Sequence, residues 1–180
     1  MPSTLTPARA IRSILCPVDF SLQSRSAILA AAVLAERFGS HITVLFVDDP
    51  LLSQAARMRF DARAVGQAAE AELRRFVERA IGRRPSDVSN RAISYAIVSG
   101  QPASEICKAV ARVSADLVVM GTRGLSGAKK LVVGSTTEAV LKKTAMNVFK
   151  LFLTLRANFQ LNRLSHVRSE KIEEVLDRAF

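Results

Sequence analysis

The sequence has few of the residues that characterise disulfide-linked proteins or binders of single-stranded nucleic acid. Its 180 residues include two cysteines, one tyrosine and no tryptophan. Two cysteines are too few for a disulfide framework, and their apolar neighbours suit a reduced cytosol. No run approaches the roughly 20 apolar residues of a membrane-spanning helix, and residues 1–10 lack the apolar segment of a secretory signal. We therefore expect a cytoplasmic protein that has no membrane partner.

The composition is that of one folded domain with an excess of positive charge. Apolar residues make up 49% of the chain, while glycine and proline, at 8 and 6, are too few for a low-complexity sequence. Lysine and arginine exceed aspartate and glutamate by 26 to 16, which gives a net charge of +10 and favours an anionic partner. Because side chains that stack on bases are scarce, a small anion is favoured over nucleic acid.

Apolar runs typical of buried strands alternate with segments of helical periodicity. Strands are expected at residues 12–19, 42–47, 92–98, 116–120 and 147–155. Helices are expected from Ser24 to a C-cap at Gly39 and at residues 68–81, 102–113 and 135–143, with residues 51–66 irregular. This alternation predicts a doubly wound α/β fold, in which an open parallel sheet has helices on both faces. Ligands bind at the carboxyl ends of such strands, which here are the positions after Val18, Val47 and Met120.

The loop after the fourth expected strand carries the most informative spacing. Gly121 is followed by two residues, Gly124, nine residues, Gly134 and then Ser135 and Thr136 at a helix start. Glycines let backbone N–H groups approach a phosphate, and a helix N-terminus adds unpaired donors and a positive dipole end. The alternative is that the glycines only shape the loop and that Ser135 only caps the helix. The strings of the P-loop and of the common dinucleotide fingerprint are absent from the sequence.

This spacing resembles the signature of the ATP-binding branch of the universal stress protein family, which Gly121, Gly124, Gly134 and Ser135 match without a gap. Residues 14–21, which include Pro17 and Asp19, also look like the first strand of that family. The resemblance covers about residues 11–143. It implies a Rossmann-like three-layer sandwich whose five parallel strands have the order 3-2-1-4-5.

The resemblance also implies a ligand set for ATP, with ADP or AMP as alternatives and with Mg²⁺ bound to the phosphates. From the adenine through the ribose to the phosphates, the implied contacts are Pro17, Asp19, Val47, Met120, Gly121, Gly124, Gly134, Ser135 and Thr136. Val47 would contribute its backbone. Asp19 has a competing role, because an acid at a strand end can cap the following helix.

We expect three segments: a flexible N-terminus at residues 1–10, a nucleotide-binding domain at 11–155 and a C-terminal extension at 156–180. The extension exceeds the usual length of the family, and the spacing of Ile172, Val175, Leu176 and Phe180 predicts an amphipathic helix. The family's last strand pairs two subunits, so the resemblance implies a homodimer. Here the family's proline is missing and Lys150 interrupts the run, which leaves that interface open.

The sequence contexts of the histidines, cysteines and arginines favour structural roles for these residues, and no metal site is predicted. His41 and His166 lack further ligands at metal-binding spacing, and Cys16 and Cys107 sit in apolar contexts that disfavour a thiolate. Arginines between residues 57 and 84 alternate with glutamates, as on a solvated helix face.

Three functions follow from these patterns. The first is a nucleotide-dependent stress or signalling module that binds ATP. The second is a slow ATPase or phosphotransfer enzyme, although the chain offers no catalytic residue beyond the candidate Arg123. The third is a protein that binds a partner or nucleic acid through its basic surface.

Overall fold

The computed structural model describes residues 11–82, 93–121, 134–144 and 149–151. The elements in chain order are β1 (Ser13–Val18), α1 (Leu22–Phe38), β2 (His41–Asp48), α2 (Pro50–Arg59), α3 (Ala62–Ile81), β3 (Ile93–Ser99), α4 (Pro102–Arg112), β4 (Leu117–Val119), α5 (Ser135–Lys143) and β5 (Phe149–Leu151). The expected segments 1–10 and 156–180 lie outside these residues.

The strands form one five-stranded sheet in the order β3-β2-β1-β4-β5. Each neighbouring pair is parallel; for example, Cys16 of β1 lies opposite Val44 of β2. The predicted parallel α/β class is confirmed, and the strand order is the one that the family resemblance implies. Because β1 has β2 on one side and β4 on the other, the order of the strands reverses beside β1.

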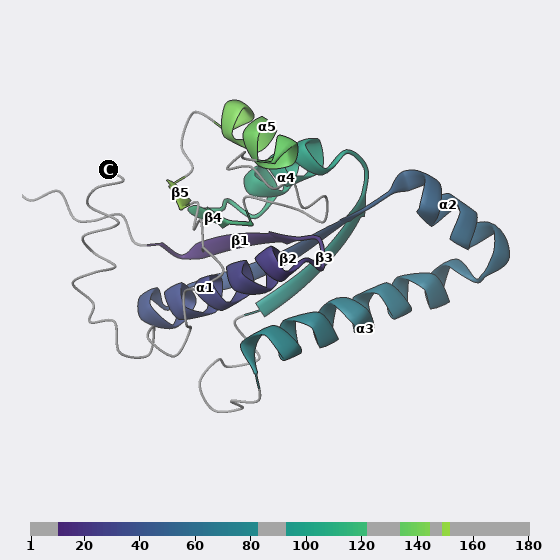
Figure 1. Ribbon diagram of the computed structural model, residues 1–180, viewed down its shortest axis with the longest axis horizontal. Helices are drawn as coiled ribbons and strands as arrows, with labels where there is room; N and C mark the ends of the chain where they lie inside the picture. The colour runs from purple at the N-terminus through teal and green to yellow at the C-terminus, as the bar shows by residue number, and fades with distance from the viewer. Residues whose placement is uncertain (1–10, 83–92, 122–133, 145–148, 152–180) are drawn as a thin grey trace, which may run out of the picture.

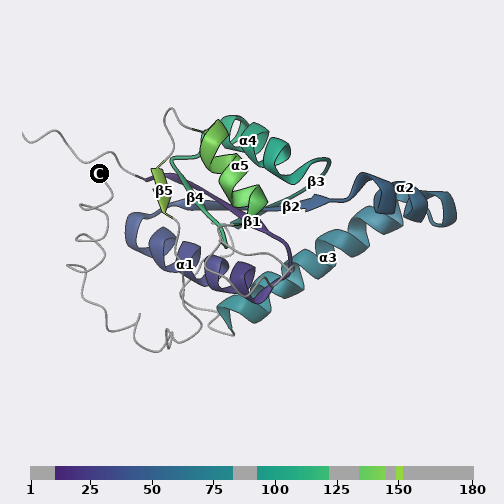
Figure 2. The same cartoon turned by 45° about the horizontal axis from the view of Figure 1, so that its top comes forward.

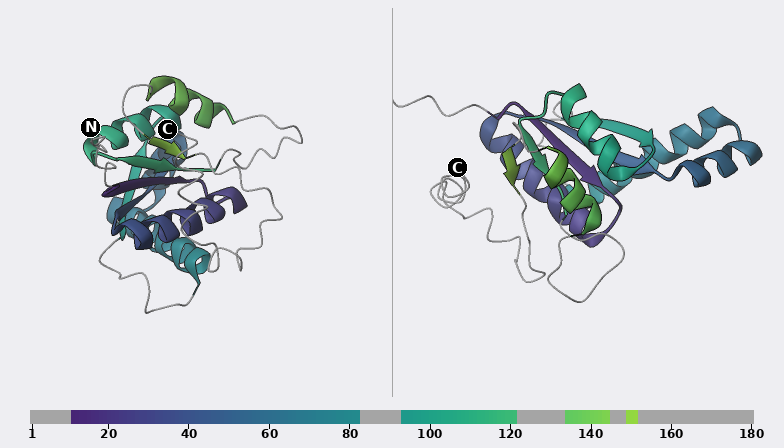
Figure 3. Two further views of the ribbon diagram at one scale, coloured as in Figure 1. Left: turned by 90° about the vertical axis from the view of Figure 1, so that its left-hand side faces the viewer. Right: turned by 90° about the horizontal axis from the view of Figure 1, so that it is seen from above.

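Helices cover both faces of the sheet, as Figures 1 and 2 show. α1 and α3 lie on one face and α4 and α5 on the other, which is clearest in the end view of Figure 3. Side chains along β1 alternate between the two cores: Ile14 and Cys16 pack on the α1 side, and Leu15 packs on the α4 side. A strand buried on both faces has to be apolar throughout, which explains the unbroken apolar run of β1.

Helix α1 begins earlier than the sequence predicts. Its N-cap is Ser21, whose hydroxyl accepts a hydrogen bond from the backbone N–H of Ser24 at 3.1 Å. Ser24 therefore lies in the first turn of the helix instead of preceding it. The predicted C-cap is confirmed, because Gly39 has the left-handed backbone that ends many helices.

The prediction that residues 51–66 are irregular is wrong. Pro50 opens α2, where its fixed φ suits a first helical position, and Asp61 caps α3 by accepting from the N–H groups of Arg63 and Ala64. Both start signals are present in the sequence, but residues 51–60 mix large apolar side chains with Ser, Gln, Ala and Arg and give little apolar periodicity. α2 and the adjoining half of α3 extend beyond the sheet (Figures 1 and 3).

The arginines between residues 57 and 84 that lie on α3, which are Arg63, Arg74, Arg75 and Arg79, are exposed, as predicted, whereas Arg59 belongs to α2 and residues 83–84 lie outside the described residues. Arg74 pairs with Glu70 at 2.7 Å, and Arg75 and Arg79 lie 3.8 Å from Glu72. The Arg74 guanidinium also lies 4.3 Å from the centre of the Tyr95 ring on β3. Within the described ranges, no helix is long and apolar enough to cross a membrane.

Candidate functional site

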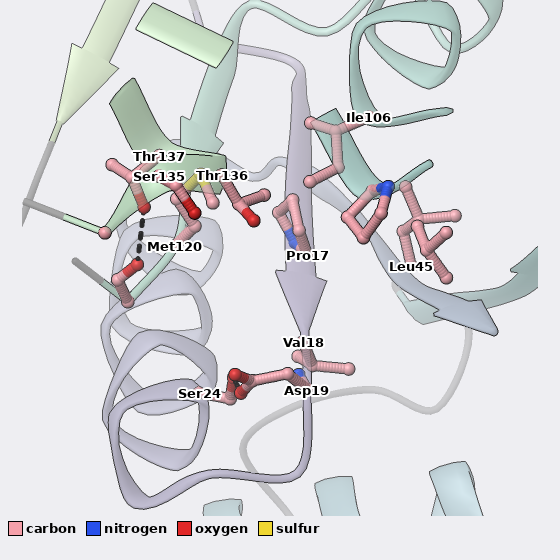
Figure 4. Close-up of a pocket in the computed structure, with 14 residues that line it drawn as sticks. Pro17, Val18, Asp19, Ser24, Leu45, Ile106, Met120, Ser135, Thr136 and Thr137 are labelled. Carbon is pink, nitrogen blue, oxygen red and sulfur yellow. Dashed lines mark hydrogen bonds between the residues drawn. The ribbon is translucent and has the colours of Figure 1, made fainter. Parts of the chain in front are cut away.

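A cavity of about 280 Å³ opens at the carboxyl ends of β1, β2 and β4, beside the point where the strand order reverses. This is near the lower end of the size range of small-molecule sites. Figure 4 shows its wall, with β1 at the centre and α5 to one side. It is lined by Pro17, Val18, Asp19, Ser24, Leu45, Val47, Pro102, Ile106, Met120, Gly121, Gly134, Ser135, Thr136 and Thr137.

Every described residue of the predicted ligand set lines this one cavity. The exception in the set is Gly124, which lies outside the described residues. Residues 17–19, 47, 120–121 and 134–136, which are well separated in the chain, are therefore brought to one place by the fold. The contacts that these residues make with a nucleotide remain a prediction.

The end of β1 holds the Asp19 carboxylate in a local network. Its Oδ1 accepts from the Ser24 hydroxyl at 2.5 Å and from the backbone N–H of Ser21 at 3.1 Å. The backbone N–H of Asp19 donates in turn to the Ser24 hydroxyl oxygen at 3.0 Å. The N-cap of α1 is Ser21 and not Asp19. Asp19 therefore stabilises the turn before α1 and does not cap the helix.

Phe20 makes this turn with an uncommon backbone. Its φ is 60°, in the left-handed region that side chains with a Cβ rarely adopt. The ring packs edge-on against Phe46 and Phe76, with centroids 4.8 and 5.1 Å apart. These aromatic contacts stabilise a bend that directs the chain away from β1 directly after Asp19.

The N-terminus of α5 forms one side wall of the cavity (Figure 4). Gly134 is the N-cap and has no side-chain cap, and Ser135 and Thr136 of the first turn line the cavity. The first N–H groups of a helix lack intrahelical partners and carry the positive end of its dipole, so this wall suits an anion. Thr137, which is 3% exposed, donates to the carbonyl of Gly121 at 3.1 Å and links α5 to the end of β4 (Figure 4).

The acid of this first turn is paired. Glu138 accepts from Lys142 at 2.7 Å, and that hydrogen bond together with the lysine charge lowers the pKa of Glu138. Because a cation compensates its charge, Glu138 opposes a bound anion less than a lone carboxylate would.

Apolar side chains from β2 and α4 form the remaining wall. Leu45 and Ile106 are buried, Val47 is partly buried, and Pro102 stands at the start of α4. Such a surface suits the flat face of a nucleobase. Sequence reasoning missed the lining residues Val18, Ser24, Leu45, Pro102, Ile106 and Thr137. The spacing of Pro102 and Ile106, four residues apart on one helix, was the available signal for two of them.

Both cysteines have packing roles in this part of the molecule. Cys16 is fully buried in the core on the α1 side of the sheet, and burial raises its pKa to about 12, so the thiol stays protonated. Cys107 packs partly buried on the α4 side. Across the described ranges, no three His, Cys, Asp or Glu side chains gather as metal ligands would.

The sequence model described as "Universal stress protein family" matches residues 10–149. A universal stress protein of Methanocaldococcus jannaschii is 27% identical over 138 residues, which cover 73% of this chain and 76% of that protein.

Solved structures are similar over the same region. The universal stress protein UspA from Lactobacillus plantarum matches with a TM-score of 0.59 and 26% identity, over 79% of this chain and 99% of that one. A universal stress protein solved in complex with cAMP matches with a TM-score of 0.54 and 20% identity, over 79% of this chain and 98% of that one. At 20% identity, the similarity to the second structure shows only that the two proteins share a fold.

Proposed function

The chain belongs to the universal stress protein family, and on that premise we propose that it is a nucleotide-dependent stress or signalling module that binds ATP. ADP and AMP are alternative ligands of the same site. The proposal treats residues 11–155 as the nucleotide-binding domain of a cytoplasmic protein.

The observation that carries the proposal is the pairing of two unlike walls in one cavity. The α5 N-terminus offers backbone donors for phosphates, while the strand ends offer an apolar surface and the Asp19 carboxylate for a base. A ligand that contacts both walls must have an anionic end and an apolar end that carries hydrogen-bond donors. ATP has both, in its phosphates and its adenine. A protein of the same fold has been solved with cAMP, a nucleotide that also has an anionic end and a base.

Mg²⁺ accompanies the phosphates in this proposal. Among the described residues that line the cavity, Asp19 is the one carboxylate. Mg²⁺ is commonly bound through one or two carboxylates together with substrate phosphates and water. We therefore assign most of its ligands to the nucleotide and water.

We also propose a homodimer paired through β5. Among the described strands β5 stands at the edge of the sheet, where backbone groups on the side away from β4 can pair with another strand. Sedimentation velocity at micromolar concentrations is expected to give the mass of two chains. A single-chain mass would contradict the dimer and leave the nucleotide site unaffected.

The sharpest test of the ATP proposal uses a substitution with opposite effects on binding and stability. Ser135→Asp adds a negative charge in the first turn of α5, where it stabilises the helix by about 0.3–1 kcal/mol but repels a phosphate. Calorimetric titration is expected to show at least tenfold weaker ATP binding by this variant. Urea unfolding is expected to show equal or higher stability.

Gln67→Glu is the matched control, because it adds one negative charge on the exposed surface of α3, outside the cavity. We expect it to bind ATP within about twofold of the unsubstituted protein, since exposed charges at a distance are screened. No ATP binding by the unsubstituted protein, or equal binding by all three proteins, would contradict the proposal.

A further inference from the structure

We propose that Ser24 is a positioning residue of the nucleotide site, which fixes the Asp19 carboxylate so that its second oxygen is available to a donor on the ligand. This inference rests on the proposed function and adds a residue to it.

Ser24 contacts Asp19 through two hydrogen bonds, and its hydroxyl oxygen also accepts a longer one from the Ser21 hydroxyl at 3.4 Å. It is 4% exposed and lines the cavity beside Asp19, as Figure 4 shows. Its hydroxyl donates to the Asp19 carboxylate and accepts from the Asp19 backbone N–H, at 2.5 and 3.0 Å. One side chain thus holds the same residue at both its backbone and its carboxylate.

The two oxygens of the carboxylate are used unequally. Oδ1 accepts from the Ser24 hydroxyl and from the Ser21 N–H. Among the described residues, no hydrogen bond to Oδ2 is found, so this oxygen retains its capacity to accept. A carboxylate held through one oxygen cannot rotate freely, and the other oxygen is then directed without an ordering cost when the ligand arrives.

The role of Ser24 is separable from the capping of α1. The cap is the Ser21 side chain, which accepts from the backbone N–H of Ser24 at 3.1 Å. That bond needs no side chain at position 24. Ser24→Ala therefore keeps the capping bond to the Ser21 hydroxyl, while it removes both bonds to Asp19 and the longer bond, at 3.4 Å, that the Ser21 hydroxyl donates to Ser24.

The test compares two ligands that share only the phosphate end. ATP reaches both walls of the cavity, whereas inorganic triphosphate reaches the α5 end alone. With Ser24→Ala, we expect about three- to tenfold weaker ATP binding by calorimetry, the range for one lost hydrogen-bonded contact. Triphosphate binding is expected to stay within twofold. Ser24→Thr, which keeps the hydroxyl, is expected to recover most of the ATP affinity.

A matched control and a double substitution separate positioning from folding. Ser26 lies on the same helix and bonds to the carbonyl of Leu22 at 3.2 Å, outside the cavity, so Ser26→Ala should leave both ligands unaffected. In an Asp19→Ala background, Ser24→Ala should cause no further loss of ATP affinity, because the residue through which it acts is gone.

A measurement without ligand keeps this inference distinct from the proposed function. Ser24→Ala removes the acceptor of the Asp19 N–H, so amide hydrogen exchange at Asp19 should quicken at least tenfold while exchange in the middle of α1 stays unchanged. Unchanged exchange at Asp19, unchanged ATP affinity, or equal losses for ATP and triphosphate would overturn the positioning role. If the unsubstituted protein binds no ATP, the proposed function fails, and the ligand role of Ser24 fails with it, whatever the exchange rates.

Discussion

At the scale of single residues, the turn after β1 combines an unfavourable backbone with favourable packing. Phe20 has a φ of 60°, and its ring contacts Phe46 and Phe76. The left-handed region costs a residue with a Cβ about 1–2 kcal/mol, which the aromatic contacts offset in part. The bend persists because the surrounding packing determines it.

Two substitutions of Phe20 separate the cost of the left-handed backbone from the gain of the aromatic contacts. Phe20→Ala and Phe20→Gly both remove the ring, but glycine alone adopts the left-handed backbone without steric cost. We expect both variants to be destabilised, with the alanine variant less stable than the glycine variant by about 1 kcal/mol. Urea unfolding of the two purified variants measures the difference. Equal stability, or a more stable alanine variant, would show that the left-handed backbone at position 20 costs nothing.

Cys16 gives the molecule a measurable alkaline pH dependence. Burial raises the folded pKa of Cys16 above its ordinary value of 9.0, to about 12. The thiol form is therefore favoured by folding, and this contribution is complete below pH 9 and lost as the pH rises from about 9 towards 12.

We expect unfolding free energy to fall more steeply in the unsubstituted protein than in Cys16→Ala over this window, by about 1–2 kcal/mol between pH 9 and pH 10.5. Urea titrations at a series of pH values measure both slopes. The alanine variant has lower stability at pH 7 because it leaves a cavity, so the comparison concerns the slopes alone. Parallel slopes would contradict a buried neutral thiol.

At the scale of elements, two glycines have opposite relations to their helices. Gly39 ends α1 with a φ of 66°, whereas Gly66 lies inside α3. At both positions an added Cβ would meet nothing within 4 Å. Backbone conformation alone therefore decides the effect of adding a methyl group.

We expect Gly39→Ala to destabilise the protein by about 1 kcal/mol, because alanine is strained in the left-handed region. Gly66→Ala should stabilise it by about 0.5–1 kcal/mol, because alanine loses less chain entropy in a helix. Thermal and urea unfolding of the pair test both signs. A stabilising Gly39→Ala would mean that α1 ends differently from the structure.

At the scale of the whole molecule, the charge of +10 provides a field that acts on an anionic ligand wherever it approaches. This net value already counts the glutamates that pair with arginines on α3, so those ion pairs do not reduce it. The field of the net charge is screened beyond about 4 Å at 0.5 M salt, compared with about 14 Å at 0.05 M.

ATP affinity should therefore fall several-fold when NaCl is raised from 0.05 to 0.5 M. Adenosine is the matched ligand, because it presents the base and ribose without the phosphates, and its affinity should change by less than twofold. Calorimetric titrations at three salt concentrations measure both. A salt-independent ATP affinity would show that the net charge contributes nothing to binding at this site.

The sequence by itself determined the alternation of elements and hence the parallel sheet. Apolar runs such as residues 14–16 must be buried on both faces, and a parallel strand covered by helices is the element that allows this. The glycine spacing around Gly121 and Gly134, next to Ser135, pointed to the carboxyl edge of the sheet. These signals are local, so they can be read without the fold.

Only the tertiary structure decided which other residues complete the cavity. Leu45, Ile106 and Thr137 come from elements far apart in the chain, and their patterns are those of ordinary buried residues. Helix α2 escaped prediction because its mixture of apolar and polar residues shows no clear apolar stripe, so its local cue was Pro50 at the first helical position. The hydrogen bond between Ser24 and Asp19 likewise depends on the bend at Phe20, which is stabilised by contacts with Phe46 of β2 and Phe76 of α3. Contacts between distant segments depend on how whole elements pack, and a linear pattern does not contain that information.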